Sequence, residues 1–566
     1  MPPPSLPFTI SPRSLAKPFD AACARLDSAQ FASSLWSRRL DVWTSDHAVR
    51  QLIANRLGWL TALDFVAPLV PRMRAFADSV TQSGFTDVVL LGMGGSSLAP
   101  EVLRQVLCSP ARNPRFRVLD SVDPDAVRAA MARAKNTLFV LASKSGSTIE
   151  PNVMAEEAKR RVIGEGHGDW AKRFIAITDQ DTALHRRAVS EGFRDIFVNP
   201  SDIGGRYSAL SLFGMVPAAL MGLDLDGLLT RARVMEQACR VDRASENPGL
   251  ALGALMGAGA LSGRDKLTLW VPPQLQSLGL WVEQLVAEST GKHGKGVVPI
   301  TGEPTDVELG DDRVVVGLSV GAQKAPGLHR LEVEDVPHAS LEMPDLVSIG
   351  AEFLRWEVAT ATAGLLLDIN PFDEPNVQQA KDATRGLLDR YQQQHQLPFP
   401  EAHGSSSGAR LTLTEPAVEA LGAVQQTRFC RWRRRATTWL FSPTCRRTIH
   451  SGKTRCRRFV RRSQRDLPRQ RQWGSALDIS IPPASFTKVA RRTACSSSSR
   501  LTRQRTLRSL KRPIRLACWR QRRRSAISSR SIVPDDGGCS CDCQSETSIS
   551  SRESRSSWSK RCSDRR

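Results

Sequence analysis

The segment covering residues 86–107 limits the possible folds of this chain more than any other. An apolar run of strand length, residues 88–91, ends in the Gly-rich turn GMGGSS, and the chain continues with the apolar spacing of an amphipathic helix. Glycines at positions 92, 94 and 95 allow positive φ and a close approach to a ligand, and the first N–H groups of the helix attract negative charge. The segment therefore predicts an anion-binding loop in an α/β fold.

A second loop of the same kind follows the apolar residues 138–141. It carries four hydroxyl groups and one ammonium group at the start of a helix, in the order Ser143, Lys144, Ser145, Gly146, Ser147, Thr148. This set suits a phosphate monoester. For the first loop the alternative is dinucleotide binding, but the fingerprint G-x-G-x-x-G is broken because Ser97 stands at the third glycine. Both loops therefore favour a phosphate monoester.

The order of the apolar runs predicts two α/β domains. From residue 86 to about residue 223, strand-length runs alternate with helical patterns, which indicates a parallel sheet with helices on both faces. In such sheets ligands bind beyond the carboxyl ends of the strands, where both loops fall. A similar pattern resumes at residues 266–320, and helices near 345–367 and 374–394 close it. We expect an N-terminal helical scaffold (1–80, with Trp36, Trp43 and Trp59 as packing anchors), a first α/β sandwich (81–225), a second, incomplete one (226–403), and a linker and tail (404–566).

Charge and cysteine divide the chain into two unlike parts. Residues 421–566 hold 37 basic and 8 acidic groups, whereas residues 1–420 hold 42 and 49. Nine of the twelve cysteines also lie beyond residue 420, and Cys23, Cys108 and Cys239 are scattered through the rest. Three scattered thiols suit a reducing compartment. Because no apolar run is long enough to span a bilayer and the Pro-rich start lacks the apolar centre of a signal peptide, we expect a soluble, cytoplasmic protein without a membrane segment.

Three charged residues are candidates for chemistry. Arg206 follows two glycines in SDIGGRYSALS and precedes a hydroxyl-rich helix start, although a turn with a surface arginine would look the same. Glu288 ends a helix in VEQLVAESTGKHGKG and is placed to act as a general base, the alternative being a solvated glutamate at a helix end. Lys381 lies in the helix that follows INPFDEP, and most helix lysines are solvated.

Together, and in this order, the five segments resemble the phosphoglucose isomerase family, which has a double sugar-isomerase-domain fold. The resemblance covers residues from about 35 to 400, and SDIGGRYSALSLFG fits the first signature of the family. INPFDEPNVQQAK resembles the second signature more loosely, since it keeps Asp373 and Lys381 but has Glu374 and Asn376 where Gln and Gly are usual. These motifs look most like those in the isomerase half of bacterial fusion proteins in which a transaldolase comes first. We see no transaldolase barrel in this sequence.

The resemblance implies a role for each candidate. Glu288 would move a proton between C1 and C2, so that glucose 6-phosphate and fructose 6-phosphate interconvert through an enediolate, and Arg206 would stabilise that anion. Lys381 would assist ring opening. No metal or cofactor would be needed, the partner would be a small sugar phosphate, and the family's usual homodimer is the expected assembly. The phosphate would be held by the two loops, through Gly94, Gly95, Ser96, Ser143, Lys144, Ser145 and Thr148.

The resemblance also implies a histidine that protonates the ring oxygen, and this chain lacks it, since His293 follows Glu288 too closely. Residues 427–566 have neither helical nor strand periodicity and are rich in Arg, Ser, Cys and Trp together. A reading shifted by one base permits HSTGQLH in place of part of residues 478–490. We therefore hypothesise that a frameshift near residues 423–430 replaced the end of the second domain with a disordered tail. Resequencing the gene across the codons for residues 415–435 tests this hypothesis, and an extra or missing base there would confirm the frameshift.

The residues, taken together with the resemblance, leave three functions open. The first is glucose-6-phosphate isomerase, an aldose–ketose isomerase of glycolysis and gluconeogenesis, with activity impaired by the altered C-terminus. The second is isomerisation of another sugar phosphate, because nothing in the sequence determines the stereochemistry at each carbon. The third is a sugar-phosphate sensor that binds nucleic acid through the basic tail, but Cys539, Cys541 and Cys543 alternate instead of forming a zinc pattern. We favour the first function.

Overall fold

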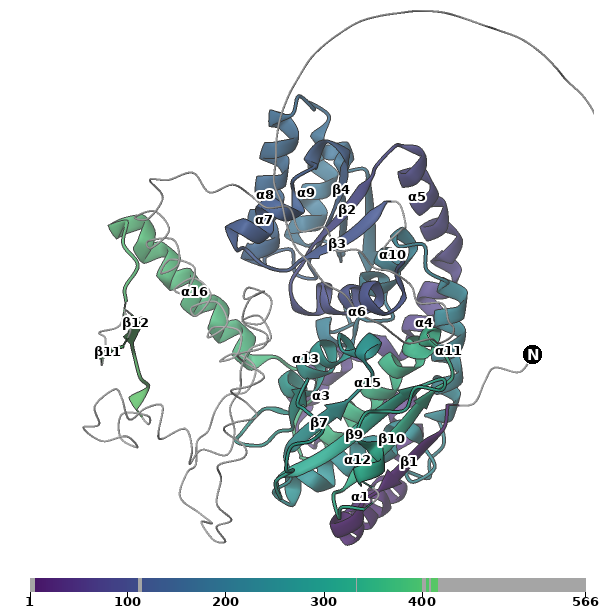
Figure 1. Ribbon diagram of the computed structural model, residues 1–566. Helices are drawn as coiled ribbons and strands as arrows, with labels where there is room; N and C mark the ends of the chain where they lie inside the picture. The colour runs from purple at the N-terminus through teal and green to yellow at the C-terminus, as the bar shows by residue number, and fades with distance from the viewer. Residues whose placement is uncertain (1–5, 110–113, 332, 400–403, 407–408, 416–566) are drawn as a thin grey trace, which may run out of the picture. The chain divides into compact units, whose positions relative to one another are not determined.

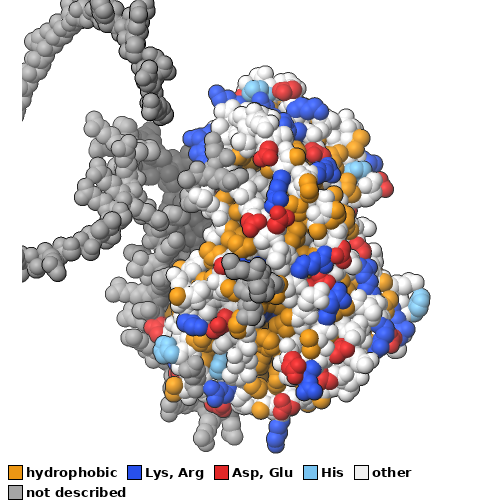
Figure 2. Space-filling view, turned by 90° about the vertical axis from the view of Figure 1, so that its right-hand side faces the viewer, with side chains coloured by type: hydrophobic (Ala, Val, Ile, Leu, Met, Phe, Trp, Pro, Cys, Tyr) orange, Lys and Arg blue, Asp and Glu red, His pale blue; other side chains and the backbone are white. Residues whose placement is uncertain are grey.

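A computed structural model describes residues 6–109, 114–331, 333–399, 404–406 and 409–415 (Figure 1). The frameshift hypothesis and the predicted tail beyond residue 415 therefore lie outside the described residues. Within the described part of the chain, no helix is long and apolar enough to cross a membrane. Figure 2 shows one face, on which Lys and Arg side chains are interspersed with Asp and Glu and form no continuous band of one sign.

The N-terminal segment is mostly helical, as predicted for residues 13–80, but it begins with strand β1 (Phe8–Ser11). The side chain of Trp59 is buried, and those of Trp36 and Trp43 pack partly buried against the same core, which confirms the three tryptophans as anchors. The helices of this segment are short, and the longest have 13 residues. They are α1 (Ala16–Ser28), α2 (Phe31–Trp36), α3 (His47–Ala54), α4 (Ala62–Val66) and α5 (Val70–Gln82).

The first sheet is parallel throughout and has the strand order β3-β2-β4-β5-β6. Val88 and Leu90 face one hydrophobic cluster, whereas Val89 and Leu91 face another, because successive side chains of a strand point to opposite sides. Both faces are therefore covered, as the continuous apolar runs predict. The strands are β2 (Asp87–Leu91), β3 (Arg115–Leu119), β4 (Thr137–Ala142), β5 (Phe174–Asp179) and β6 (Asp195–Asn199).

Helices from two parts of the chain cover this sheet (Figure 1). Side chains of α5, α6 (Leu98–Leu107) and α10 (Leu212–Leu220) belong to the cluster on one face. Those of α8 (Ile149–Gly164) and α9 (Ala183–Glu191) belong to the cluster on the other, and α7 (Pro124–Ala130) packs at its edge. This arrangement leaves the carboxyl ends of β2 and β4 followed directly by the two predicted anion loops.

The second sheet has the order β1-β10-β9-β7-β8. Its later strands are parallel, but β1 runs antiparallel to β10, with Thr9 opposite Ser340. Residues 8–11 therefore belong to the second sheet. The prediction that residues 1–80 form only a helical scaffold is wrong for these four residues. Four residues are too few to show a strand period, and their partner lies more than 300 positions away in the sequence. The remaining strands are β7 (Lys266–Trp270), β8 (Val298–Thr301), β9 (Arg313–Val320) and β10 (His338–Met343).

The main core lies between the second sheet and the helices α11 (Leu225–Ala238), α12 (Pro248–Leu261), α13 (Leu278–Thr290) and α15 (Ile349–Leu366). Every residue of α15 is buried, including the charged Glu352, Arg355 and Glu357. The opposite face of the sheet carries a small cluster around Trp270, Val315 and Leu331, the last of these in α14 (Leu328–Leu331).

Two elements follow the second sheet. Helix α16 (Pro375–Gln394) has no buried side chain among its described residues, and β11 (Gly404–Ser406) and β12 (Ala409–Leu411) form a short hairpin. The two sheets and their helices confirm the predicted α/β class. The domain boundaries at residues 225 and 403 stay predictions.

Candidate active site

The first anion loop is a short 3₁₀ turn, η4 (Gly94–Ser96), between β2 and α6. Gly94 has φ of 57°, as predicted, but Gly92 and Gly95 do not adopt positive φ, so the prediction for those two glycines is wrong. Gly95 is required for another reason. A Cβ atom at Gly95 would lie 1.9 Å from the carbonyl oxygen of Gly205, so the loop rests directly on the backbone of the segment that carries Arg206.

The second anion loop lies between β4 and α8. The hydroxyl of Ser143 is buried and has no hydrogen-bond partner among the described residues. The exposed hydroxyls of Ser145 and Ser147 lie 2.9 Å apart. Thr148 is the residue before the helix, and its side chain does not cap the first N–H groups of α8. An unpartnered hydroxyl beside an uncapped helix start is an arrangement that suits an anion.

Lys144 of this loop is already paired. Its ammonium group donates to the carboxylate of Asp179 and, at 2.7 Å, to the carbonyl oxygen of Ser201. Burial raises the pKa of Asp179 even though Lys144 acts in the opposite direction. Lys144 is therefore held in place by Asp179 and Ser201, with part of its charge compensated.

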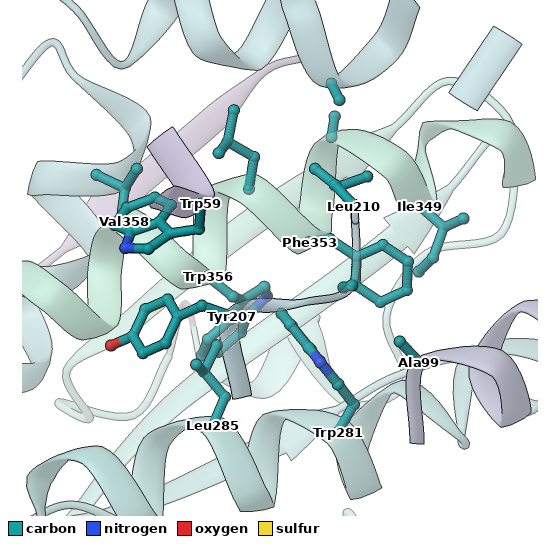
Figure 3. Packing of buried hydrophobic residues seen from close by; sticks show 14 of the residues in the cluster. Trp59, Ala99, Tyr207, Leu210, Trp281, Leu285, Ile349, Phe353, Trp356 and Val358 are labelled. Carbon is teal, nitrogen blue, oxygen red and sulfur yellow. The ribbon is translucent and has the colours of Figure 1, made fainter. Parts of the chain in front are cut away.

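Arg206 lies in the 3₁₀ turn η7 (Gly205–Tyr207) and is not a surface residue, since its side chain is only 6% exposed. Its Nε donates to the hydroxyl of Ser289 at 3.0 Å, and its Nη2 donates to the carbonyl oxygens of Pro371 at 3.1 Å and Asp373 at 3.0 Å. The neighbouring Tyr207 anchors the turn in the core, where Figure 3 shows its ring among Trp59, Leu285 and Trp356. The guanidinium is thus held in one orientation.

Glu288 lies on the last turn of α13, and its side chain is also only 6% exposed. Its Oε2 atom is 3.8 Å from Nη1 of Arg206. Burial alone would lower the pKa of Arg206, but the carboxylates of Glu288 and Glu374 outweigh it and raise that pKa. The alternatives of a surface arginine and a solvated glutamate are therefore wrong, and the two candidates meet as a buried pair.

The segment after α15 closes one side of this pair. Phe372 is buried, with its ring 5.2 Å from that of Trp43 and 5.3 Å from that of Tyr207. Next to it, Oε2 of Glu374 lies 3.3 Å from Nη1 of Arg206, and Oε1 lies 3.6 Å from Nη2 of Arg56. Aromatic packing from the N-terminal helices thus fixes a loop that carries a second carboxylate to Arg206.

Sequence reasoning missed two cations at this site. Lys292 is buried, and its Nζ lies 2.5 Å from the carbonyl oxygen of Asn370 and 2.5 Å from Oδ1 of Asp373. Burial and the neighbouring Arg206 lower the pKa of Lys292 to about 8. Arg56 comes from the distant N-terminal segment. A lysine between glycines in STGKHGKG was the available signal for Lys292, whereas nothing in the sequence around Arg56 points to the site.

Lys381 is not part of this group of contacting side chains. It lies on α16 and makes no hydrogen bond or ion pair with any residue that the structure describes. The structure brings together Gly94, Gly95, Arg206 and Glu288, and it places Ser143, Lys144, Ser145 and Thr148 together in the second loop. The role of Lys381 stays a prediction.

Residues 66–311 match the family model described as phosphoglucose isomerase. Over these residues the chain is similar to the phosphoglucose isomerase family. The match includes both anion loops, Arg206 and Glu288, but it ends before the segment that carries Glu374 and Lys381.

Individual relatives agree with this family. The chain is 30% identical over 351 residues to the glucose-6-phosphate isomerase of Synechococcus sp. (strain CC9605), which covers 54% of this chain and 65% of that protein. It is 35% identical over 214 residues to the glucose-6-phosphate isomerase of Prochlorococcus marinus (strain MIT 9313), and this match covers 37% of this chain and 39% of that protein. The match thus spans less than two thirds of either relative.

A solved structure shares the fold. The crystal structure of a glucose-6-phosphate isomerase from Chlamydia trachomatis superposes with a TM-score of 0.55 at 18% identity, covering 70% of this chain and 90% of that one. This likeness supports the phosphoglucose isomerase fold for the two-sheet part of the chain.

Proposed function

We propose that this chain interconverts glucose 6-phosphate and fructose 6-phosphate. The observation that carries the proposal is the buried pair of Arg206 and Glu288, whose side chains lie 3.8 Å apart next to the first anion loop. A carboxylate and a fixed guanidinium are what an aldose–ketose isomerisation requires, namely a group to move a proton and a cation for the anion formed.

The reaction follows from these two groups. The carboxylate of Glu288 takes the proton from C2 of the open-chain aldose, and the bonding electrons move into an enediolate. The Nη1 group of Arg206 faces Glu288, so it lies where the negative charge on the O1–O2 edge develops. Glu288 then returns the proton to C1 while the proton of the C2 hydroxyl moves to O1, so that C2 becomes the carbonyl carbon of the ketose and O1 its hydroxyl. Because Arg206 is held by three hydrogen bonds from its other nitrogens, it needs no reorientation during the reaction.

The two loops are proposed to hold the phosphate of the sugar. Ser143 contributes a hydroxyl that lacks a partner, and Ser145 and Thr148 contribute exposed or half-buried hydroxyls at an uncapped helix start. Gly94 and Gly95 contribute backbone N–H groups of the η4 turn, and Ser96, whose N–H donates to the carbonyl oxygen of Met93 at 3.2 Å, contributes its hydroxyl. Lys144 adds positive charge when an anion draws its ammonium away from Asp179.

Three further points belong to the proposal. Lys381 would assist opening of the sugar ring, and the expected histidine is absent from the described residues around the site, so turnover of the cyclic sugar is expected to be weak. A homodimer is the proposed assembly, and the cytoplasm is the proposed location. The final sugar specificity is proposed from the family alone.

The test replaces the base without changing its shape. We expect Glu288→Gln to lower kcat for fructose 6-phosphate formation by roughly 10²–10⁴-fold with little change in KM, since it removes general base catalysis. Glu283→Gln on the same helix is the matched control and should retain activity. Equal kcat for the Glu288 variant and the native chain would overturn the proposal. Faster turnover of another aldose phosphate would show that glucose 6-phosphate is not the preferred substrate.

A further inference from the structure

Arg206 faces two carboxylates in a site that must receive an anion. Its Nη1 atom lies 3.3 Å from Oε2 of Glu374 and 3.8 Å from Oε2 of Glu288. The other two nitrogens are bound by Ser289 and by backbone carbonyls. Nη1 is therefore the nitrogen of Arg206 that can face a substrate, and Glu374 already lies on it.

Glu374 approaches from the solvent side. Its side chain is 36% exposed, whereas that of Arg206 is 6% exposed. A second guanidinium, that of Arg56, lies 3.6 Å from the other carboxylate oxygen. The carboxylate thus bridges two arginines, and an anion that reached both of them would have to take its place.

We propose that Glu374 is an internal anion that occupies Arg206 until the substrate displaces it, and that Arg56 becomes a second cation for the substrate once Glu374 has moved. This inference rests on the proposed function, because it assigns Glu374 and Arg56 to the same sugar-phosphate site. The proposal also explains why a Glu at position 374 matters, since the second signature of the phosphoglucose isomerase family usually has Gln there. A glutamine at position 374 has the same shape but only one acceptor oxygen, so it could accept from one of the two arginines and would not compete through a full negative charge.

The loop does not need the charge of Glu374 in order to stay in place. Phe372 is buried between Trp43 and Tyr207, and Lys292 holds the carbonyl oxygens of Asn370 and Asp373. These contacts remain when Glu374 becomes glutamine. A change in ligand affinity in that variant would therefore report the charge and not the position of the loop.

The experiment measures binding to the full-length chain without relying on turnover. Isothermal titration uses 6-phosphogluconate, whose C1 carboxylate places negative charge near the position of the enediolate oxygens. We expect Glu374→Gln to bind about tenfold more tightly than the native chain, equivalent to about 1.4 kcal/mol, and Glu374→Asn to change affinity in the same direction. Glu334→Gln is the matched control, because Glu334 is 38% exposed, pairs with Arg330 and should leave affinity unchanged.

A gain in affinity cannot arise from damage to the fold, so the expected result separates the charge effect from a structural one. Arg56→Gln in the Glu374→Gln background should abolish most of the gain. Equal or weaker binding by both Glu374 variants, with binding by the native chain intact, would overturn this inference alone. No binding by the native chain or by any variant would overturn the proposed function and this inference with it.

Discussion

The close contact between Gly95 and Gly205 allows a quantitative test of how the two halves of the site are aligned. In the Gly95→Ala variant the new Cβ would lie 1.9 Å from the carbonyl oxygen of Gly205 and 2.3 Å from its carbonyl carbon. Real Cβ atoms do not come closer than 3.0 Å to such atoms, and both partners are backbone. The first anion loop and the Arg206 turn must therefore separate by about 1 Å.

That separation moves the phosphate site away from the cation that faces the reacting carbons. A misplacement of about 1 Å costs on the order of 10²-fold in rate, or about 2.7 kcal/mol. We therefore expect kcat/KM of Gly95→Ala to fall about 100-fold. The loss should be shared between kcat and KM, because both the phosphate loop and Arg206 are involved.

The assay is fructose 6-phosphate formation, followed over a range of substrate concentrations together with the thermal unfolding midpoint of each variant. Gly164→Ala, at the end of α8, is the control, since a Cβ there meets no atom within 4 Å. It should retain full activity. A Gly95→Ala variant that unfolds at the native midpoint and keeps kcat/KM within threefold of the native value would refute the reasoning about this contact.

Three further predictions concern single side chains. Ser143→Ala should weaken binding of inorganic phosphate severalfold by titration, while the unfolding midpoint stays equal or rises, because the buried hydroxyl has no partner in the described protein; unchanged phosphate affinity would remove Ser143 from the site. Because the pKa of Lys292 is lowered to about 8, its ammonium is lost as pH rises above that value, so kcat/KM should fall there. Lys292→Arg, which stays charged, should not show this fall in kcat/KM. A fall of equal size in that variant would show that the loss of charge on Lys292 does not cause it. Burial raises the pKa of Glu357 well above its ordinary value, so the folded protein retains a proton that the unfolded chain releases above about pH 4.5. The unfolding free energy should therefore decrease as pH rises from 5 to 8, by less in Glu357→Gln than in the native chain, and parallel curves for the two proteins in urea titrations would contradict this.

The first sheet and the two anion loops could be predicted because their signals are local. A buried parallel strand reads as a continuous apolar run, and a Gly- or Ser-rich loop before a helix reads as an anion site. The meeting of Arg206 and Glu288 was expected only from the resemblance to a family. The two residues are 82 positions apart, and no periodic pattern relates them.

The remaining features depend on contacts over long sequence distances. Strand β1 is defined by its pairing with β10, and Arg56 reaches the site only because the N-terminal helices pack on the loop of Phe372. Gly95 has no unusual φ, and only the neighbouring Gly205 backbone explains why a side chain is excluded. The sequence around Lys292 does not distinguish it from an ordinary solvated lysine. Burial, which is not a property of the local sequence, distinguishes Lys292 from a solvated lysine.

The most direct test of the central claim follows one hydrogen atom. Glucose 6-phosphate labelled with deuterium at C2 is incubated with the full-length chain, and the product is analysed by NMR. If Glu288 carries the proton, the native chain will form fructose 6-phosphate with deuterium moved to C1 or exchanged with water, and Glu288→Gln will do neither. Conversion by the Glu288→Gln variant at the native rate, or retention of deuterium at C2 after prolonged incubation with the native chain, would contradict the account.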